Sequence, residues 1–280
     1  MPGCQVPLHY GFRYAGVTAT ILNSMRVTKR RVPSLLKALG RARFPDALDL
    51  PVGKYRLVRV FKHDFFAATG LFRSDDGRQA VLKIGRMSDV MGLPGRWIGR
   101  YLARREARIY RALADLEAVP AFLGMWQDCA FVHEFVPGHE LQKGEPVGDE
   151  FFERLEALIG SIHERAMAYV DLEKCENIIV GDDGLPYLID FQISWHMPGW
   201  WGSRFPPSVW LRGLFQEMDR YHLLKHRRRN RPDQLTPEQL DESFNLPSYI
   251  RLHRALIKPL QVVRRGLLRR LDPDYASARR

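Results

Sequence analysis

The chain has 280 residues, of which 45% are apolar and 27% are charged. This composition excludes a wholly disordered chain, a collagen-like repeat and a small scaffold held by disulfides. Its three cysteines have no C-x-x-C spacing, which argues against a disulfide framework or a zinc knuckle and fits a reducing compartment. We expect no transmembrane helix, because no stretch of about 18 residues is free of charge, and no signal peptide. The sequence therefore predicts a cytoplasmic protein with one large domain or two small lobes.

Positive charge is concentrated at the two ends of the chain, whose formal net charge is +11. Residues 1–60 contain 11 Lys and Arg against 2 Asp and Glu, and residues 203–280 contain 17 against 8. The middle, residues 61–202, is acidic, with 15 against 22. Basic ends suit an anionic surface such as membrane lipid, lipopolysaccharide or nucleic acid. They equally suit Arg-rich helices that pair with the acidic middle, so both interpretations stay open.

The first elements with a clear period are three strands and a helix. Apolar alternation predicts strands at residues 55–61, 67–73 and 79–84, and the Ser-Asp-Asp-Gly sequence at 74–77 predicts a hairpin turn between the last two. After Gly95 we expect a helix of about 20 residues with an apolar stripe in steps near 3.6. The stripe consists of Ile98, Leu102, Ile109 and Leu113.

Farther along the chain, short strands alternate with helices. Apolar runs bounded by turns predict four more strands, at residues 122–126, 130–135, 178–180 and 187–189. Asp149 is expected to N-cap a helix before the last two strands, and the chain after Trp195 is expected to be helical and basic. Strands with one helix, followed by helices around a short hairpin, are typical of a two-lobed α+β fold.

Lys83 and Glu106 are two charges on otherwise apolar faces. Lys83 lies inside the strand at 79–84, and Glu106 falls on the apolar stripe of the following helix. A buried charge is costly unless it is paired, so the pattern predicts that strand and helix pack together and that the two side chains form an ion pair. Such a pair would place an ammonium group against nucleotide phosphates. The alternative is an edge-strand lysine that points to solvent.

Four more polar residues surround the second hairpin. Asn177 comes just before its first strand and Asp190 just after its second, so antiparallel pairing places them side by side. Two oxygen ligands at one point suit Mg²⁺, which usually takes one or two protein ligands plus phosphate oxygens. Asp171, in the preceding loop, is placed to accept a proton from a hydroxyl nucleophile, and Lys174 to face the transferred phosphate. Taken singly, each acid could equally be a turn or cap residue.

Together these segments resemble the protein-kinase-like superfamily. Val81-Leu82-Lys83-Ile84 is similar to its strand with the phosphate-binding lysine, and Glu106 to its helix glutamate. Residues 171–177 are similar to its catalytic loop, and Leu-Ile-Asp-Phe-Gln at 188–192 to its D-F-G segment. The loop has one residue more than the usual spacing, which looks like the atypical bacterial branch of lipopolysaccharide core kinases and RIO-like proteins. The resemblance covers roughly residues 54–225.

The resemblance implies a bilobal α+β kinase-like fold. We expect a basic N-terminal extension at residues 1–52, a small β-rich N-lobe at 53–137 and a larger helical C-lobe at 138–280. It also implies ATP and Mg²⁺ as cofactors. Lys83 and Glu106 would then bind the phosphates of ATP. Asn177 and Asp190 would bind the metal.

Two further sites come from the same resemblance. Residues 131–138 are similar to a kinase hinge, so backbone groups of Glu134 and Val136 would bond the adenine edge. Residues 218–225 are similar to a late helix of the atypical branch, in which Asp219 would hold the backbone of the catalytic loop.

The sequence also departs from the kinase pattern. No G-x-G-x-x-G precedes Lys83, and residues 61–70 contain only Gly70. Gln192 replaces the glycine of D-F-G, and no arginine precedes Asp171, so we expect no switch by phosphorylation of an activation loop. These departures leave a pseudokinase open. Phosphate binding falls to one of three side chains, Lys62, His63 and Thr69, or the affinity is weak.

Two later segments allow two interpretations each. A cluster of aromatic residues follows Gln192, and a basic helix with an apolar stripe is predicted over residues 251–271. Each suits either a membrane interface or packing on the C-lobe. The aromatic cluster consists of Trp195, Trp200, Trp201, Phe205 and Trp210.

These patterns predict a kinase that moves the γ-phosphate of ATP to a hydroxyl acceptor. The basic ends favour a glycolipid of the lipopolysaccharide-core type, or another membrane-proximal acceptor, and hence a peripheral position at the inner face of the membrane. An atypical Ser/Thr protein kinase is the second enzyme hypothesis. A non-catalytic pseudokinase that acts as a nucleotide-sensing adaptor is the hypothesis of another class. Nucleic acid is disfavoured as a partner, because no recognised binding motif is present.

Overall fold

The computed structural model describes residues 37–89, 95–197, 199–200 and 204–245. The predicted helix over residues 251–271 lies outside the described residues, as do Trp201 and most of the basic N-terminal segment. In the part of the chain that the structure describes, no helix is both long enough and apolar enough to cross a membrane.

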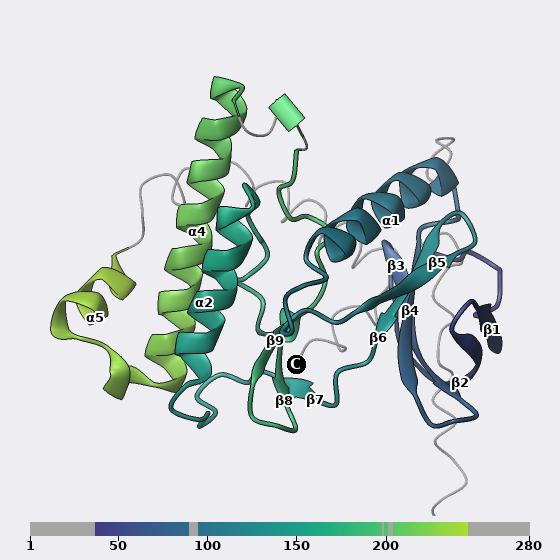
Figure 1. Cartoon of the computed structure of the whole chain (residues 1–280), viewed down its shortest axis with the longest axis horizontal. Helices are drawn as coiled ribbons and strands as arrows, with labels where there is room; N and C mark the ends of the chain where they lie inside the picture. The colour runs from purple at the N-terminus through teal and green to yellow at the C-terminus, as the bar shows by residue number, and fades with distance from the viewer. Residues whose placement is uncertain (1–36, 90–94, 198, 201–203, 246–280) are drawn as a thin grey trace, which may run out of the picture. The chain divides into compact units, whose positions relative to one another are not determined.

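The first half of this region forms a six-stranded antiparallel sheet with the order β1-β2-β3-β4-β6-β5 (Figure 1). The predicted strands at residues 55–61, 67–73 and 79–84 are confirmed as parts of β2, β3 and β4. β1 is a short strand that the sequence pattern did not predict. The six strands are β1 (Ala47–Leu50), β2 (Gly53–His63), β3 (Ala67–Ser74), β4 (Gln79–Gly85), β5 (Phe122–Trp126) and β6 (Ala130–Glu134).

Helix α1 (Gly95–Ala112) packs against β4 and β6 (Figure 1). The buried residues of its first half are small: Gly95, Gly99 and Ala103. Gly99 permits the close approach, because a Cβ atom at this position would lie 2.0 Å from the carbonyl oxygen of Arg86. Ile98 is instead 39% exposed, so the predicted apolar stripe is wrong at its first residue. Glu106 lies on the buried face of the helix, as predicted.

The second half contains a three-stranded sheet, with the order β7-β8-β9, and helices. The predicted hairpin is confirmed by β8 and β9. Helix α2 is also confirmed, but Asp149 is not its N-cap: Glu150 occupies that position and its side chain makes no capping bond. The elements are β7 (Gly138–Glu140), α2 (Phe151–Glu164), η2 (Cys175–Asn177), β8 (Ile178–Gly181), β9 (Pro186–Leu188), α4 (Pro206–Asn230), η3 (Pro232–Gln234) and α5 (Pro237–Phe244).

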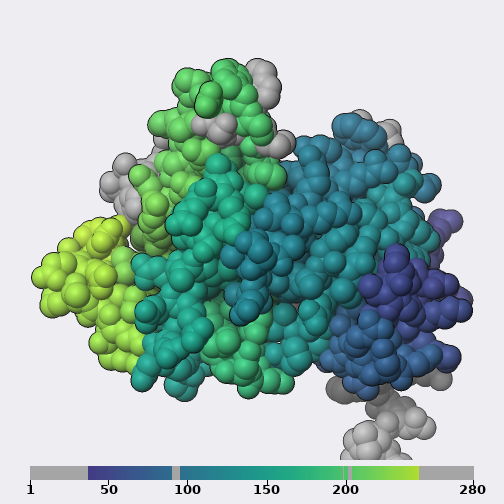
Figure 2. Space-filling view, viewed as in Figure 1, coloured from purple at the N-terminus to yellow at the C-terminus, as the bar shows by residue number. Residues whose placement is uncertain are grey.

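Helices α2 and α4 pack on each other, and α5 packs on α4 at the surface of the molecule (Figure 2). The aromatic segment after Gln192 is divided between packing and exposure. Trp195 packs on Phe215, with ring centroids 5.4 Å apart. Trp200 and Trp210 are 55% and 70% exposed.

One apolar core connects α1, β6 and α2 with the two loops around residues 169 and 191. Phe191 is fully buried in this core, and its ring centroid lies 5.1 Å from that of Tyr110 of α1 and 5.3 Å from that of Tyr169. Because Phe191 directly follows Asp190, this packing fixes the backbone that carries the Asp190 carboxylate. An antiparallel sheet with a single helix, followed by a larger helical part, is the predicted kinase-like α+β fold.

Candidate active site

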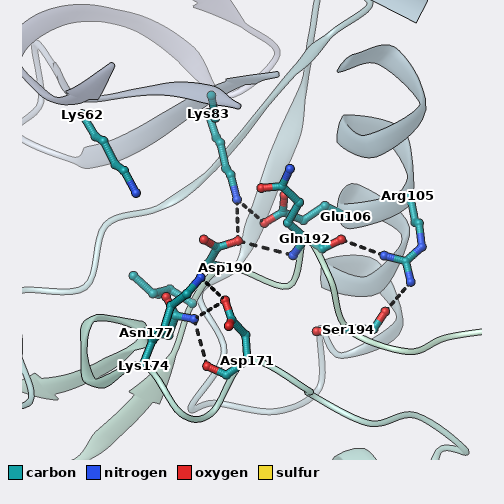
Figure 3. Close-up of polar contacts among 12 residues, drawn as sticks. Lys62, Lys83, Arg105, Glu106, Asp171, Lys174, Asn177, Asp190, Gln192 and Ser194 are labelled. Atoms are coloured by element: carbon teal, nitrogen blue, oxygen red, sulfur yellow. Dashed lines mark hydrogen bonds and ion pairs between the residues drawn. The ribbon is translucent and has the colours of Figure 1, made fainter. Parts of the chain in front are cut away.

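Lys83 of β4 lies between two carboxylates (Figure 3). Its Nζ is 2.8 Å from Oε1 of Glu106 on α1 and 2.7 Å from Oδ1 of Asp190. The Lys83 and Glu106 side chains are 12% and 2% exposed, so the two charges that the sequence pairs do meet in a buried position. The contact with Asp190 lies beyond the sequence prediction, and it joins the sheet, the helix and the segment after β9.

Burial and the neighbouring charges set the protonation of this cluster. Burial opposes the Lys83 ammonium, but Asp190 and Glu106 outweigh it and raise the pKa of Lys83. Burial likewise opposes ionisation of Asp190, yet Lys83 outweighs it and lowers the pKa of Asp190 to about 2. Burial dominates at Glu106 and raises its pKa to about 7 despite Lys83. Asp190 is therefore the carboxylate that stays ionised through the neutral range, as a metal ligand must.

The loop before β8 brings Asp171, Lys174 and Asn177 together. Nδ2 of Asn177 donates to Oδ2 of Asp171 at 3.0 Å and to the Asp171 carbonyl at 3.2 Å. Nζ of Lys174 lies 2.5 Å from the same carboxylate oxygen. Burial raises the pKa of Asp171, although both donors lower it. The carboxylate is thus held in place and more basic than an ordinary aspartate, which suits a group that accepts a proton.

Asn177 and Asp190 lie at adjacent ends of the β8–β9 hairpin, where the Ile189 amide donates to the Asn177 carbonyl at 3.1 Å. Asp190 uses Oδ1 for Lys83 and for the Gln192 amide, and no described residue donates to its Oδ2. Because Nδ2 of Asn177 faces Asp171, its Oδ1 points away from that carboxylate. Among the described residues, none donates to Oδ2 of Asp190 or to Oδ1 of Asn177, and these two residues lie at adjacent ends of the hairpin.

Asp219 anchors this loop from α4 and is completely buried. Its carboxylate accepts hydrogen bonds from the amides of Tyr169 and Val170, both at 2.7 Å, and from Nε2 of His163 at 3.0 Å. Val170 has a φ of 72°, a left-handed conformation that is strained for a β-branched residue. The three bonds hold the loop backbone in a shape that it would not keep by itself. His163 is a member of this site that the sequence pattern did not single out.

We expect Asp219→Asn to destabilise the protein by about 2–4 kcal/mol, because an amide cannot accept the three N–H donors that converge on the carboxylate. Urea unfolding measures the change. Asp182→Asn, on the exposed turn between β8 and β9, is a matched control with an expected effect within about 0.5 kcal/mol. Equal stability of the two variants would show that Asp219 does not hold the loop.

Arg105 of α1 is a second residue that the pattern did not single out. Its Nη1 donates to the carbonyl of Gln192 at 2.8 Å, and its Nη2 donates to the carbonyl of Ser194 (Figure 3). The segment after Asp190 is thereby fastened to the helix that carries Glu106. In the sequence Arg105 is one of several arginines on α1, and nothing local distinguishes it from its neighbours.

The segment that resembles a kinase hinge follows β6. The Glu134 carbonyl accepts a hydrogen bond from Nδ1 of His133 at 2.7 Å, and the Phe135 amide donates to the Gln79 carbonyl at 3.2 Å. Among the described residues, none forms a backbone hydrogen bond with the amide or carbonyl of Val136. The contacts of Glu134 and Val136 with adenine stay a prediction.

Gly70 permits close packing of the Phe44 ring on the sheet. It lies within β3, where a Cβ atom would be 2.6 Å from the ring of Phe44. The turn between β2 and β3, where kinases have their glycine-rich loop, contains no glycine.

Comparisons with known proteins give structural likenesses at low sequence identity. No family model and no curated protein matches the chain. Two crystal structures of the Rio2 kinase from Chaetomium thermophilum are similar, each with a TM-score of 0.48 and 18% sequence identity. The similarity covers 68% of this chain and 61% or 62% of those chains, and one of the two is an ADP/Mg²⁺-phosphoaspartate complex. The chain thus spans less than two thirds of the length of these kinases.

Proposed function

We propose that this chain is a phosphotransferase that moves the γ-phosphate of Mg²⁺-bound ATP to a hydroxyl group. The observation that carries the proposal is the polar cluster in which Lys83 pairs with Asp190, while Asp171 is held by Asn177 in the adjacent loop. Its parts complement a metal-bound triphosphate: an ammonium group for phosphate oxygens, an ionised carboxylate for the metal and a more basic carboxylate for the acceptor.

Mg²⁺ fits two side-chain oxygens at the adjacent ends of the hairpin. This ion prefers oxygen ligands and is usually held by one or two protein groups plus substrate phosphates. Oδ2 of Asp190 and Oδ1 of Asn177 are such ligands, and the lowered pKa of Asp190 keeps its oxygen available. When bound, Mg²⁺ supplies neutralisation of the phosphate charge.

The chain's own residues then divide the remaining work. Asp171 accepts the proton of the acceptor hydroxyl, whose oxygen bonds to the γ-phosphorus as the bond from that phosphorus to the ADP oxygen breaks. Lys83, held by Glu106, binds phosphate oxygens, and we assign Lys174 to the transferred group. The cluster supplies positioning and charge stabilisation, which provide most of the catalysis in phosphoryl transfer.

For the acceptor we propose a hydroxyl of an anionic glycolipid at the membrane. The support comes from the sequence, in which two ends of net charge +9 flank a middle of −7. Each Lys or Arg near an anionic membrane surface contributes about 1 kcal/mol to binding.

The test is transfer of labelled γ-phosphate to fractionated envelope glycolipids and to generic protein substrates in parallel, with Asp171→Asn as the blank. Label in a glycolipid fraction is the expected result. Label in protein alone would replace the glycolipid by Ser/Thr acceptors. If the protein binds ATP but transfers its γ-phosphate to no acceptor, the enzyme hypothesis is wrong and the nucleotide-sensing adaptor is left.

Removal of Mg²⁺ should weaken ATP binding by about tenfold or more, because Asp190 and the triphosphate would then repel each other without a cation between them. Titration calorimetry in Mg²⁺ and in EDTA measures the difference. The same affinity in both buffers would exclude the metal site at the hairpin.

A further inference from the structure

The strand register places Lys62 and Thr69 on the same face of the sheet as Lys83. Lys62 of β2 lies opposite Thr69 of β3, and Thr69 lies opposite Lys83 of β4. Residues directly opposite each other in antiparallel strands project their side chains from the same face. Neighbouring strands lie about 4.8 Å apart, so the backbones of Lys62 and Lys83, two strands from each other, are about 10 Å apart. Both lysines extend from the sheet toward the loop with Asp171 and Asn177 in Figure 3.

The two ammonium groups have different surroundings. Lys83 is buried between its two carboxylates, whereas the Lys62 side chain is 58% exposed. Its ion-pair partner is Asp64, two residues away, with Nζ 3.1 Å from Oδ2. Across the site, burial and Glu176 raise the pKa of Glu140 of β7, and Lys62 lowers it. Lys62 is therefore a solvent-accessible cation near the loop side of the site, and its ion pair within the described residues is the exposed one with Asp64.

The turn between β2 and β3 explains why a side chain is needed here. Oδ1 of Asp64 accepts hydrogen bonds from the amides of Phe66 at 2.8 Å and Ala67 at 3.0 Å, and the Asp64 amide donates to the Ala67 carbonyl at 3.0 Å. A glycine-rich loop offers such amides to phosphate oxygens. In this chain a carboxylate already occupies them, so a phosphate could bind the turn only by displacing Asp64.

We infer that Lys62, Thr69 and Lys83 form a row of side chains across the sheet that binds the phosphate chain of the nucleotide in place of a glycine-rich loop. Lys62 binds the outer phosphate oxygens, and Lys83 binds the oxygens nearest Asp190. The Thr69 hydroxyl donates a hydrogen bond to a phosphate oxygen between the two lysines. Lys62 leaves Asp64 when the phosphate binds, so Asp64 competes with the ligand for this ammonium group. This inference deepens the proposed function and rests on it for the identity of the ligand.

The test measures binding by calorimetry in Mg²⁺ with three probes: ATP, inorganic tripolyphosphate and adenosine. Lys62→Gln should weaken both phosphate probes by about tenfold, which is about 1.4 kcal/mol, and leave adenosine unchanged. Lys54→Gln is the matched control, because Lys54 is an exposed lysine at the other end of β2. It should leave all three affinities unchanged.

Asp64→Asn provides a test of opposite sign. The substitution keeps an oxygen for the Phe66 and Ala67 amides and removes the charge that competes for Lys62. ATP and tripolyphosphate should then bind severalfold more tightly than to the unsubstituted protein. Damage to the fold would weaken binding, so a gain cannot arise from misfolding.

The outcomes separate this inference from the proposed function. If ATP and tripolyphosphate bind the Lys62→Gln variant and the unsubstituted protein with equal affinity, Lys62 has no role in phosphate binding. The proposed phosphotransferase activity would then be unaffected. Tripolyphosphate that binds in a Lys62-dependent way while ATP does not bind would retain the phosphate row and overturn the use of ATP. Failure of both phosphate probes to bind the unsubstituted protein would overturn both.

Discussion

Asp171→Asn should lower the rate of phosphate transfer by about 10²–10⁴-fold and leave the affinity for Mg²⁺-ATP nearly unchanged. The carboxylate is fixed by Asn177 and Lys174 and has a raised pKa, so it is suited to take the proton of the acceptor. The asparagine side chain cannot take that proton. The substitution removes no group that we assign to binding of nucleotide or metal. Single-turnover kinetics and calorimetry on the same preparation measure the two quantities.

Asp190→Asn should behave differently, because Asp190 supplies a metal ligand and also an ion-pair partner of Lys83. We expect it to lose nucleotide affinity as well as transfer. Asp182→Asn, on the exposed turn of the same hairpin, should change neither quantity. If Asp171→Asn lost ATP binding as completely as Asp190→Asn, the division of roles between the two carboxylates would be wrong.

Lys83→Met should destabilise the protein by about 3–5 kcal/mol, since it leaves Glu106 and Asp190 without their shared cation. Glu106→Gln should cost less, because Lys83 keeps Asp190. A double-mutant cycle measured by urea unfolding should give a coupling between Lys83 and Glu106 of about 0.5–3 kcal/mol. The exposed pair of Glu150 and Arg154 is the control, with an expected coupling of about 0.3–0.5 kcal/mol.

The cost of Lys83→Met should also grow with pH. Burial already raises the pKa of Glu106 to about 7 with Lys83 present, and loss of the cation raises it further. The folded variant then keeps a proton that the unfolded chain, with an ordinary pKa of 4.5, has lost. The unsubstituted protein loses stability in the same way up to about pH 7, where its own Glu106 ionises, so the cost of Lys83→Met grows as pH rises above about 7, where only the folded variant still binds this proton. Unfolding at several pH values measures this slope, and a cost independent of pH would show that Glu106 is not the stranded group.

The sequence by itself determined the features that depend on local period and turns. Alternation defined three strands of the first sheet, and the turn residues at 181–184 defined the hairpin that brings Asn177 next to Asp190. The cost of a lone buried charge was enough to pair Lys83 with Glu106 before any packing was known. Each of these conclusions follows from neighbours within one element, or from a charge that has to find a partner.

Only the tertiary structure decided which groups from distant elements meet. Lys83 and Asp190 are 107 positions apart in the sequence. Arg105 of α1 donates to the carbonyls of Gln192 and Ser194, which lie in an irregular segment far along the chain. The first half of the buried face of α1 consists of Gly95, Gly99 and Ala103, because the helix approaches the backbone near Arg86 too closely for Ile98 to face the sheet. The amides of Phe66 and Ala67 donate to the Asp64 carboxylate because this side chain is directed back at its own turn. The direction of the Asp64 side chain therefore decides whether these amides are available to a phosphate. Such choices depend on distances between elements, which local periodicity does not encode.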